Sequence, residues 1–312
     1  MAAYLIRRLW QMVPTLMGVV LLVFFLFKWF GGDPAEVLGG LNASPDQIKS
    51  IRTQLGLDEP VWYQLWLFVK QIVTFDFFKD TATTESIANL FATRLPATLT
   101  VMVPILILEV VLAIPIAMYV AYKRGSLTDR TLTVVTTVAL SISFLVYVIV
   151  GQYVFGFQLG WFPVQGWSDN LATNLSTYVP LPVFLALLVS LAPQTRLYRS
   201  FFLDELGQDY VRTARAKGLT ENKVLFRHVL RNATIPILTN IGLLLPGIFV
   251  GSFLIEVFFS IPGIGREVLL AVNRSDFPVI QAVTVYLAVL TMFINLLTDL
   301  AYKVADPRVV LK

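Results

Sequence analysis

The chain has 312 residues, 56% of them hydrophobic and 14% charged, and a formal net charge of +4. Soluble domains contain roughly 45 to 50% apolar and about 25% charged residues, so this composition excludes an ordinary soluble fold and favours a chain solvated by lipid. The lack of cysteine excludes disulfides, iron–sulfur clusters and thiol nucleophiles, and the single histidine, His228, excludes an HExxH zinc site.

Six stretches with few charged residues are long enough to cross a hydrocarbon layer about 30 Å thick, which needs about 20 helical residues. The predicted spans are one within residues 1–30 and five more at 95–122, 131–155, 179–198, 235–259 and 278–302. Arg7 and Arg8 precede the first stretch as in a secretion signal, but no small-residue cleavage site follows it, so we expect it to remain as a span. The predicted fold class is an all-α integral membrane protein with six transmembrane helices.

The distribution of lysine and arginine predicts the orientation, because short loops rich in these residues stay on the cytoplasmic side. Sixteen of the 24 lie at the N-terminus, in the loops after the second and fourth spans and in the tail 303–312, all on one side of the predicted topology. We therefore expect both termini in the cytoplasm and an extracytoplasmic segment at 31–94, with short helices on the outer leaflet. No nucleic-acid-binding motif surrounds the basic residues, so topology explains the net charge and no nucleic-acid partner is expected.

The loop 199–234 is longer than a connection between two spans requires. Small and apolar residues recur every three or four positions over 204–216, which predicts an amphipathic helix. Gly218 follows as a helix C-cap, where glycine adopts the left-handed conformation with little strain. Thr220 then begins a second helix that continues into the fifth span. The sequence thus predicts two short helices joined by a glycine corner.

The same loop contains the motifs YVRTARAKGL at 210–219 and HVLRNA at 228–233. Elsewhere the chain contains RLPATL at 94–99, KRGSLTDR at 123–130, FSIPGIGRE at 259–267 and NLLTDLAYKVADPR at 295–308. Together these motifs resemble the permease subunits of binding-protein-dependent ABC importers, in the dipeptide and oligopeptide branch. The resemblance implies a type I, MetI-like permease fold in a bacterial or archaeal cytoplasmic membrane, with 95–308 as the core permease domain and 199–234 as a cytoplasmic coupling loop.

The resemblance also implies partners: a second homologous permease, two ATP-binding-cassette ATPase subunits that hold ATP and magnesium, and an extracytoplasmic substrate-binding protein. This chain lacks the G-x-x-x-x-G-K-[ST] phosphate loop, so we expect it to bind no cofactor or metal and to catalyse no reaction. The residues implied in ATPase coupling are Asp209, Tyr210, Arg212, Thr213, Ala214, Arg215, Ala216, Lys217, Gly218, Leu219 and His228. The wider superfamily has an acidic residue where this chain has Arg212, so ion pairs known for the acidic version are not transferred.

Glu109 and Glu256 are acids inside predicted spans, where a carboxylate costs about 2.5 to 3.5 kcal/mol and is therefore a functional candidate. For Glu109 the alternatives are a contact along a peptide route and a structural role, as an interhelical hydrogen bond or a protonated acid. For Glu256 they are a gate or substrate contact and a structural acid near the membrane interface. Asn295 and Asp299 are further pore candidates.

Gly247 and Gly251 have the Gly-x-x-x-Gly spacing that lets two helices approach closely. This spacing predicts that another helix packs there, and a helix of the partner permease is one candidate. His228 has two interpretations, a neutral histidine that packs within the loop and a proton switch.

The expected function is import of dipeptides or oligopeptides through a pore shared with the second permease. Nickel complexes, glutathione and opines are alternative cargoes, because the resemblance assigns discrimination largely to the binding protein. An autonomous ion-coupled carrier is the alternative of another class, and it requires intramembrane charges or broken helices in corresponding halves. A membrane-embedded hydrolase is disfavoured because the HExxH and GxSxG motifs are absent.

Overall fold

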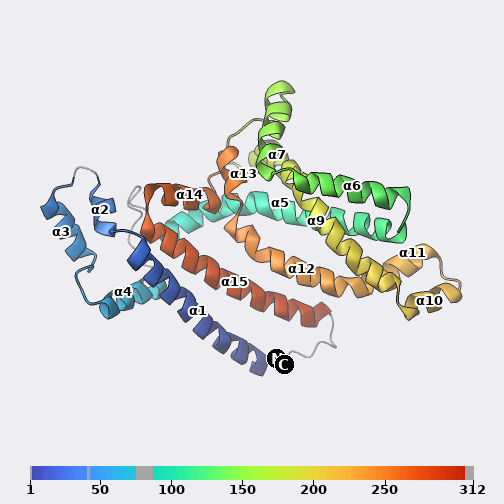
Figure 1. Ribbon diagram of the computed structural model, residues 1–312, viewed down its shortest axis with the longest axis horizontal. Coiled ribbons are helices and arrows are strands. Elements are labelled where there is room, and N and C mark those ends of the chain that lie inside the picture. Colours follow the sequence, from blue (N-terminus) through green and yellow to red (C-terminus); the bar gives the residue numbers. More distant parts are fainter. Residues whose placement is uncertain (1, 41–42, 75–86, 306–312) are drawn as a thin grey trace. The chain divides into compact units, whose positions relative to one another are not determined.

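The computed structural model describes residues 2–40, 43–74 and 87–305 of the chain (Figure 1). Every regular element in these ranges is a helix, and none of them forms a strand. Among the described residues, five helices are long and apolar enough to cross a membrane, and a bent pair of helices provides a sixth span when the pair is counted as one. The predicted all-α fold with six transmembrane segments is therefore confirmed. Of the predicted tail, residues 306–312 lie outside the described ranges.

The chain divides into two compact units. Among the described residues, the first unit contains those up to Ala97 and Pro262–Leu296, and the second contains Thr98–Ile261 together with the end of α15 from Leu297. The helices of the first unit are α1 (Ala2–Phe30), α2 (Pro34–Gly39), α3 (Pro45–Gln54), α4 (Val61–Thr74), the start of α5 (Ile87–Tyr122), α14 (Ile264–Arg274) and most of α15 (Phe277–Ala305). In the described parts of the predicted segment 31–94, three short helices precede the start of α5, and the extracytoplasmic side of this segment stays a prediction.

Local capping chemistry explains where the short helices of the first unit begin. The Asp33 carboxylate accepts a hydrogen bond from the Ala35 backbone N–H at 3.0 Å and starts α2. Ser44 and Gln47 form a reciprocal capping box at the start of α3. Both helices have proline at their first position, where its missing N–H leaves no hydrogen bond unmade.

Apolar residues from both ends of the sequence form the core of the first unit. The rings of Phe24 on α1 and Phe68 on α4 lie 5.9 Å apart, so α4 packs beside the last turns of the first span. An ion pair joins Arg94 of α5 to Glu267 of α14 at 3.6 Å. The buried members of this core are Val20, Val23, Phe24, Phe68, Leu90, Ile264, Ala271, Val279, Ala282, Val283 and Val285.

The second unit is built around α9, which packs against α6, α7 and α12. Arg199 on α9 pairs with Asp129 on α6 at 2.8 Å, and the same carboxylate accepts the Gly125 backbone N–H at 2.9 Å. The helices of this unit, with η marking π-helices, are the rest of α5, α6 (Leu127–Ser141), α7 (Phe144–Gly151), η1 (Gln152–Gln158), α8 (Leu171–Thr173), η2 (Asn174–Tyr178), α9 (Pro180–Leu206), α10 (Asp209–Ala216), α11 (Glu221–Lys223), η3 (Val224–Val229), α12 (Leu230–Val250) and α13 (Phe253–Phe258).

The predicted span 131–155 is not one straight helix. Ile142 and Ser143 have extended backbone, with ψ of 129° and 139°, so α6 ends there and the helix that follows is bent by 88°. Neither residue is a glycine or a proline, so the usual helix-breaking signals are missing at this point. The structure therefore corrects a single helix over 131–155 to a bent pair.

The predicted span 235–259 is also interrupted, because α12 ends at Val250 and Gly251 has φ +74°. Glu256 on α13 is 1% exposed and accepts a hydrogen bond from the Thr98 hydroxyl of α5 at 2.9 Å. A Cβ atom on Gly251 would lie 2.3 Å from Glu256 Oε1 and 2.8 Å from Thr98 Cγ2. Glycine is therefore required at this position both for its left-handed backbone and for space beside the buried pair.

Gly247 has a different environment, since a Cβ atom there would meet no atom within 4 Å. Gly247 and Gly251 therefore make no joint helix-packing contact within the described part of the chain. Gly242 does, because a Cβ atom on it would lie 2.1 Å from Thr298 Cγ2 of α15. The close approach of α12 and α15 occurs at Gly242, and a contact of Gly247 with a partner permease stays a prediction.

These two glycines provide a matched test. Gly251→Ala should lower the free energy of unfolding by about 2 kcal/mol or more, because it combines backbone strain with overpacking against Glu256 and Thr98. Gly247→Ala should leave it nearly unchanged. The midpoint of thermal unfolding in detergent measures both effects, and equal midpoints for the two variants would contradict the assigned environment of Gly251.

Candidate coupling site

The loop 199–234 is divided into helices differently from the prediction. α9 continues beyond the predicted span 179–198 as far as Leu206, and α10 begins only at Asp209. Residues 204–206 therefore extend α9, and the predicted helix 204–216 is corrected to 209–216. In Figure 1, α10 and α11 lie together at one end of the second unit, next to the end of α9 and the start of α12.

The glycine corner is present as a complete Schellman motif. Gly218 has φ +76°, its N–H donates to Arg215 O at 2.9 Å, and the Leu219 N–H donates to Ala214 O at 3.3 Å. Arg215 also makes two hydrogen bonds to the Glu221 carboxylate across the corner, at 2.9 and 3.2 Å. The turn between α10 and α11 is therefore held by both backbone and side-chain bonds.

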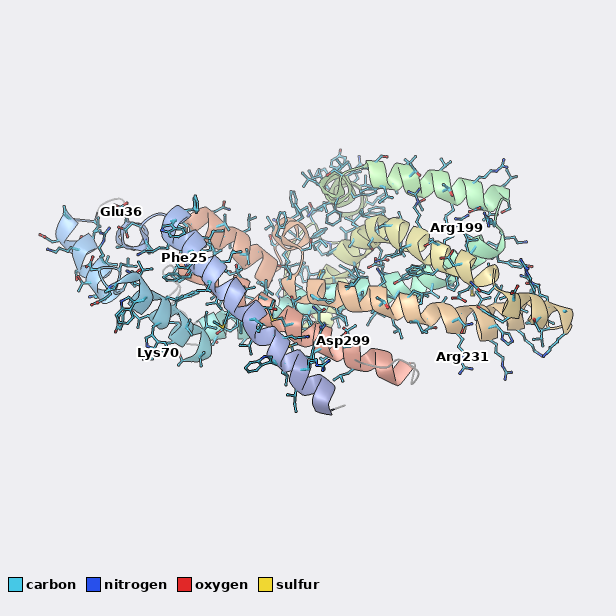
Figure 2. The ribbon with its side chains drawn as sticks, turned by 60° about the horizontal axis from the view of Figure 1, so that its bottom comes forward. Phe25, Glu36, Lys70, Arg199, Arg231 and Asp299 are labelled. Carbon is cyan, nitrogen blue, oxygen red and sulfur yellow. The ribbon has the colours of Figure 1, made fainter. Side chains whose placement is uncertain are left out.

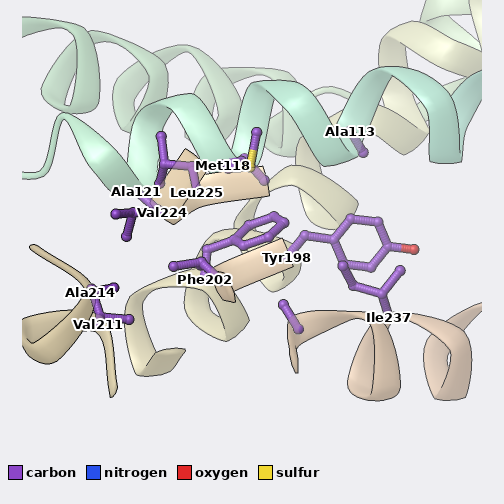
Figure 3. Close-up of a cluster of buried hydrophobic side chains, with 13 residues drawn as sticks. Ala113, Met118, Ala121, Tyr198, Phe202, Val211, Ala214, Val224, Leu225 and Ile237 are labelled. Carbon is purple, nitrogen blue, oxygen red and sulfur yellow. The ribbon is translucent and has the colours of Figure 1, made fainter. Parts of the chain in front are cut away.

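One buried cluster holds both sides of this corner against three long helices (Figure 3). Val211 and Ala214, on the inner face of α10, are 0% and 5% exposed. Figure 3 shows Phe202 of α9 between α5 and the α10 residues, and Tyr198 directed toward Ile237 of α12. This anchoring cluster consists of Ala113, Ala117, Met118, Ala121, Tyr198, Phe202, Val211, Ala214, Val224, Leu225, Val229, Ala233 and Ile237.

Moving α10 without α5, α9 and α12 would expose these side chains to solvent. Each fully buried Val, Leu or Phe contributes about 1.5 to 3 kcal/mol, so such a separation is strongly disfavoured. The short helices and the three long helices should therefore move together.

The π-helix η3 aligns the second half of the loop with the anchoring cluster. Thr220 starts α11 with extended backbone but makes no side-chain capping bond. The buried residues Leu225, Val229, Ala233 and Ile237 then recur at a constant spacing of four. Side chains spaced four residues apart rotate gradually around the axis of an α-helix, which has 3.6 residues per turn. The wider turn of η3, which contains Leu225 and Val229, reduces this rotation at the start of the series.

Tyr210 connects α10 to two other helices through its hydroxyl group. The hydroxyl donates to Glu205 Oε2 at the end of α9 and also hydrogen-bonds Asn232 of α12. Burial raises the pKa of Tyr210 to about 12; the bond to Asn232 opposes this rise and the charge of Glu205 adds to it. The phenol therefore stays protonated at neutral pH and keeps donating to Glu205.

The outer face of α10 and the corner is open to solvent. Its exposed residues are Asp209, Arg212, Thr213, Arg215, Ala216, Lys217, Gly218 and Leu219. Arg212 and Asp209 form an ion pair at 3.4 Å, but side chains that are 76% and 94% exposed contribute little to stability. Most of the predicted coupling residues thus form one exposed, largely basic surface, whereas Ala214 is buried, and Tyr210 and His228 are half-buried.

Two polar contacts around the site were not expected from the sequence. The Tyr198 hydroxyl donates to Asn240 Oδ1 of α12 at 3.0 Å, and Arg199 pairs with Asp129 as described above. Both α9 residues lie at the boundary between the predicted span and the loop. Their position as polar groups at the end of an apolar run was the only feature of the sequence that could have indicated these contacts. Figure 2 labels Arg199 on α9, and it shows the exposed Arg231 projecting away from the start of α12.

The pore candidates lie on other helices than the exposed surface of α10. Glu109 on α5 is 7% exposed, and the side chain of Gln194 on α9 hydrogen-bonds its carboxyl group. This geometry favours the interhelical hydrogen bond over an open pore contact. Asn295 and Asp299 are half-buried on α15, and Figure 2 shows Asp299 near its C-terminal part. No group of three or more His, Asp or Glu side chains suited to a metal ion occurs in the described ranges.

The chain matches the family described as "Binding-protein-dependent transport system inner membrane component" over residues 113–311. It also matches that family's N-terminal region over residues 1–102. The chain belongs to this permease family. The permease is accordingly a multi-pass transport component of the inner membrane, and the resemblance inferred from its motifs is confirmed.

Peptide-transport permeases are among its relatives. The oligopeptide transport system permease protein AppB of Bacillus subtilis is 35% identical over 315 residues. The dipeptide transport system permease protein DppB of Lactococcus lactis subsp. cremoris is 34% identical over 314 residues, and a putative peptide transport system permease protein of Brucella abortus is 33% identical over 311 residues. Each alignment covers 99% of both chains.

The two faces of α10 predict different effects on stability for the same change from alanine to leucine. Ala214→Leu should destabilise the permease by about 1 to 3 kcal/mol, because position 214 lies inside the anchoring cluster. Ala216→Leu should leave stability unchanged, because Ala216 is exposed. Thermal unfolding in detergent distinguishes the two variants, and a loss of stability in Ala216→Leu alone would reverse the assigned faces.

Proposed function

We propose that the permease forms one half of a peptide-import pore and that the exposed surface of α10 and the glycine corner receives an ATPase subunit in the cytoplasm. The observation that carries this proposal is the pairing of two features: an exposed surface at 209–219 and, directly beneath it, a buried cluster continuous with α5, α9 and α12. A soluble partner that grips this surface gains a rigid connection to three long helices.

The mechanism that follows is mechanical. Closure of an ATPase dimer around ATP and magnesium would displace α10, and the anchoring cluster would transmit the displacement to α5, α9 and α12. Two homologous permeases moved in this way would alternate the pore between its two openings, as in the rocking motion of other transporters. The chain itself contributes attachment and a passage, and ATP chemistry belongs to the partner subunits.

Peptides are the proposed cargo because the relatives are named as peptide, dipeptide and oligopeptide permeases. A binding protein on the other side of the membrane would deliver them, as the family description "binding-protein-dependent" suggests. Nickel complexes, glutathione and opines remain alternative cargoes of the same machinery. An ion-coupled carrier has less support, because Glu109 and Glu256 are both hydrogen-bonded to neighbouring helices.

Gly218 offers a sharp test of ATPase attachment. A Cβ atom at this position would meet nothing within 4 Å, so a substitution acts through backbone strain and through contact with a partner. Gly218→Val should weaken attachment of the ATPase about tenfold and reduce uptake, since a left-handed conformation costs a β-branched residue roughly 1 to 2 kcal/mol. Gly218→Asn is the matched control, because asparagine tolerates this conformation, and it should retain much more attachment.

Co-purification of the ATPase with each variant and uptake of a labelled dipeptide provide the measurements. Normal membrane levels of both variants would show that insertion is intact. Wild-type attachment of Gly218→Val would contradict the proposed docking surface. Uphill uptake by the purified chain alone, driven by an ion gradient, would support the carrier instead.

A further inference from the structure

The first unit contains a cavity of about 480 Å³ that the transport mechanism does not use. It lies between the C-terminal end of α1, the segment from α2 to α4 and the start of α15. Its wall includes the aromatic residues Phe24, Phe27, Phe68 and Phe277, while Lys28, Asp33 and Arg52 provide charged groups. A volume in this range suits part of a small amphipathic molecule.

The charges in the cavity favour an anion. Arg52 and Asp33 form an ion pair with each other, so their charges largely cancel. Lys28 donates to Gln64 Oε1 at 2.6 Å, which uses one of the three N–H groups of its ammonium. Gln64 is itself held by the backbone carbonyls of Leu57 and Glu59, at 2.8 and 2.6 Å, so Lys28 is positioned by a rigid neighbour. The charged side chains that line the cavity therefore sum to one positive charge, and Lys28 is the cation without an acidic partner in the lining.

The cavity also has a defined depth relative to the first span. That span comprises Ile6–Phe30, so Lys28 lies two residues before its end. Phe24 lies one helical turn deeper, about 6 Å at 1.5 Å per residue. Trp29 lines the cavity and is 72% exposed, as expected for a residue of the aromatic belt at a membrane surface. The cavity thus extends from headgroup depth toward acyl-chain depth.

The exposed face of α4 supports the same depth. Trp62, Trp66 and Val73 are 72%, 61% and 73% exposed and lie on one stripe of the helix. The opposite face packs on α1, beside the last turns of the span. An amphipathic helix that exposes tryptophan at this level is typical of the lipid–water interface. This face of α4 is therefore suited to contact with lipid beside the cavity.

We propose that this cavity binds the headgroup of an anionic phospholipid, with the lipid phosphate on Lys28 and the adjoining acyl chains against Phe24, Phe27 and Phe68. The cation provides a charge-assisted hydrogen bond to phosphate. The aromatic wall provides apolar contact to the chains. This assignment is independent of the cargo and of the ATPase-docking surface.

Native mass spectrometry of the purified full-length permease in detergent tests the proposal, with phosphatidylglycerol as the probe and phosphatidylcholine as the zwitterionic comparison. Phosphatidylglycerol should bind about tenfold more tightly, and Lys28→Gln should remove most of this preference, because one charge-assisted hydrogen bond is lost. Lys28→Arg should keep it. Lys70→Gln is the matched control, because Lys70 lies on α4 but outside the cavity, is exposed and is labelled in Figure 2.

The other outcomes each overturn the proposal. An equal loss in Lys28→Gln and Lys70→Gln would indicate non-specific attraction between charges. Competition by inorganic phosphate alone would indicate a phosphate site, and displacement of the lipid by a dipeptide would indicate a substrate site. If Lys28→Gln fails to fold, cross-linking of a photoactivatable phosphatidylglycerol to the wild-type protein provides an independent test. It should label α1 or α4 near Phe24 and Phe68, and labelling confined to other helices would contradict the assignment.

Discussion

The packing of α10 and η3 against α5, α9 and α12 is the constraint on which the proposed function depends. α10 has only eight residues, and isolated helices shorter than about 12 to 15 residues are marginal in water, so the anchoring cluster is what keeps it folded. Movement of α10 alone would expose the same cluster and is therefore strongly disfavoured. Apolar packing, rather than surface ion pairs such as Arg212 with Asp209, therefore fixes the exposed surface of α10 to the three long helices.

Polar groups inside the second unit follow a consistent rule, in which each buried acid has a partner on another helix. Glu109 of α5 pairs with Gln194 of α9, and Glu256 of α13 pairs with Thr98 of α5. Such pairing lowers the cost of a carboxylate in an apolar environment and ties helices together. It favours a structural role for both acids and a passive passage. The cavity at the end of α1 differs, because Lys28 retains capacity to bind an anion.

Several features could be predicted from short stretches of sequence, and others could not. Gly218 with Leu219 indicated the corner, and Ser44 to Gln47 has the spacing of a capping box, because such caps depend on neighbouring residues alone. The helix breaks at Ile142 and after Val250 could not be predicted in this way, because neither contains a proline and only the second is marked by a glycine, Gly251. The Gly-x-x-x-Gly spacing does not mark a close helix approach within the described chain, since Gly251 follows the end of α12 and the close approach occurs at Gly242.

The sequence by itself determined that the chain lies in lipid, how many spans it has and which family it resembles. Long apolar runs are required wherever a helix crosses lipid, and the motifs of the loop 199–234 are contiguous. Only the tertiary structure decided which face of α10 is buried, where the long helices break and which groups satisfy the buried acids. The physical reason is that these outcomes depend on partners far away in the chain, such as Thr98 and Glu256, which are 158 residues apart and meet only when the second unit has folded.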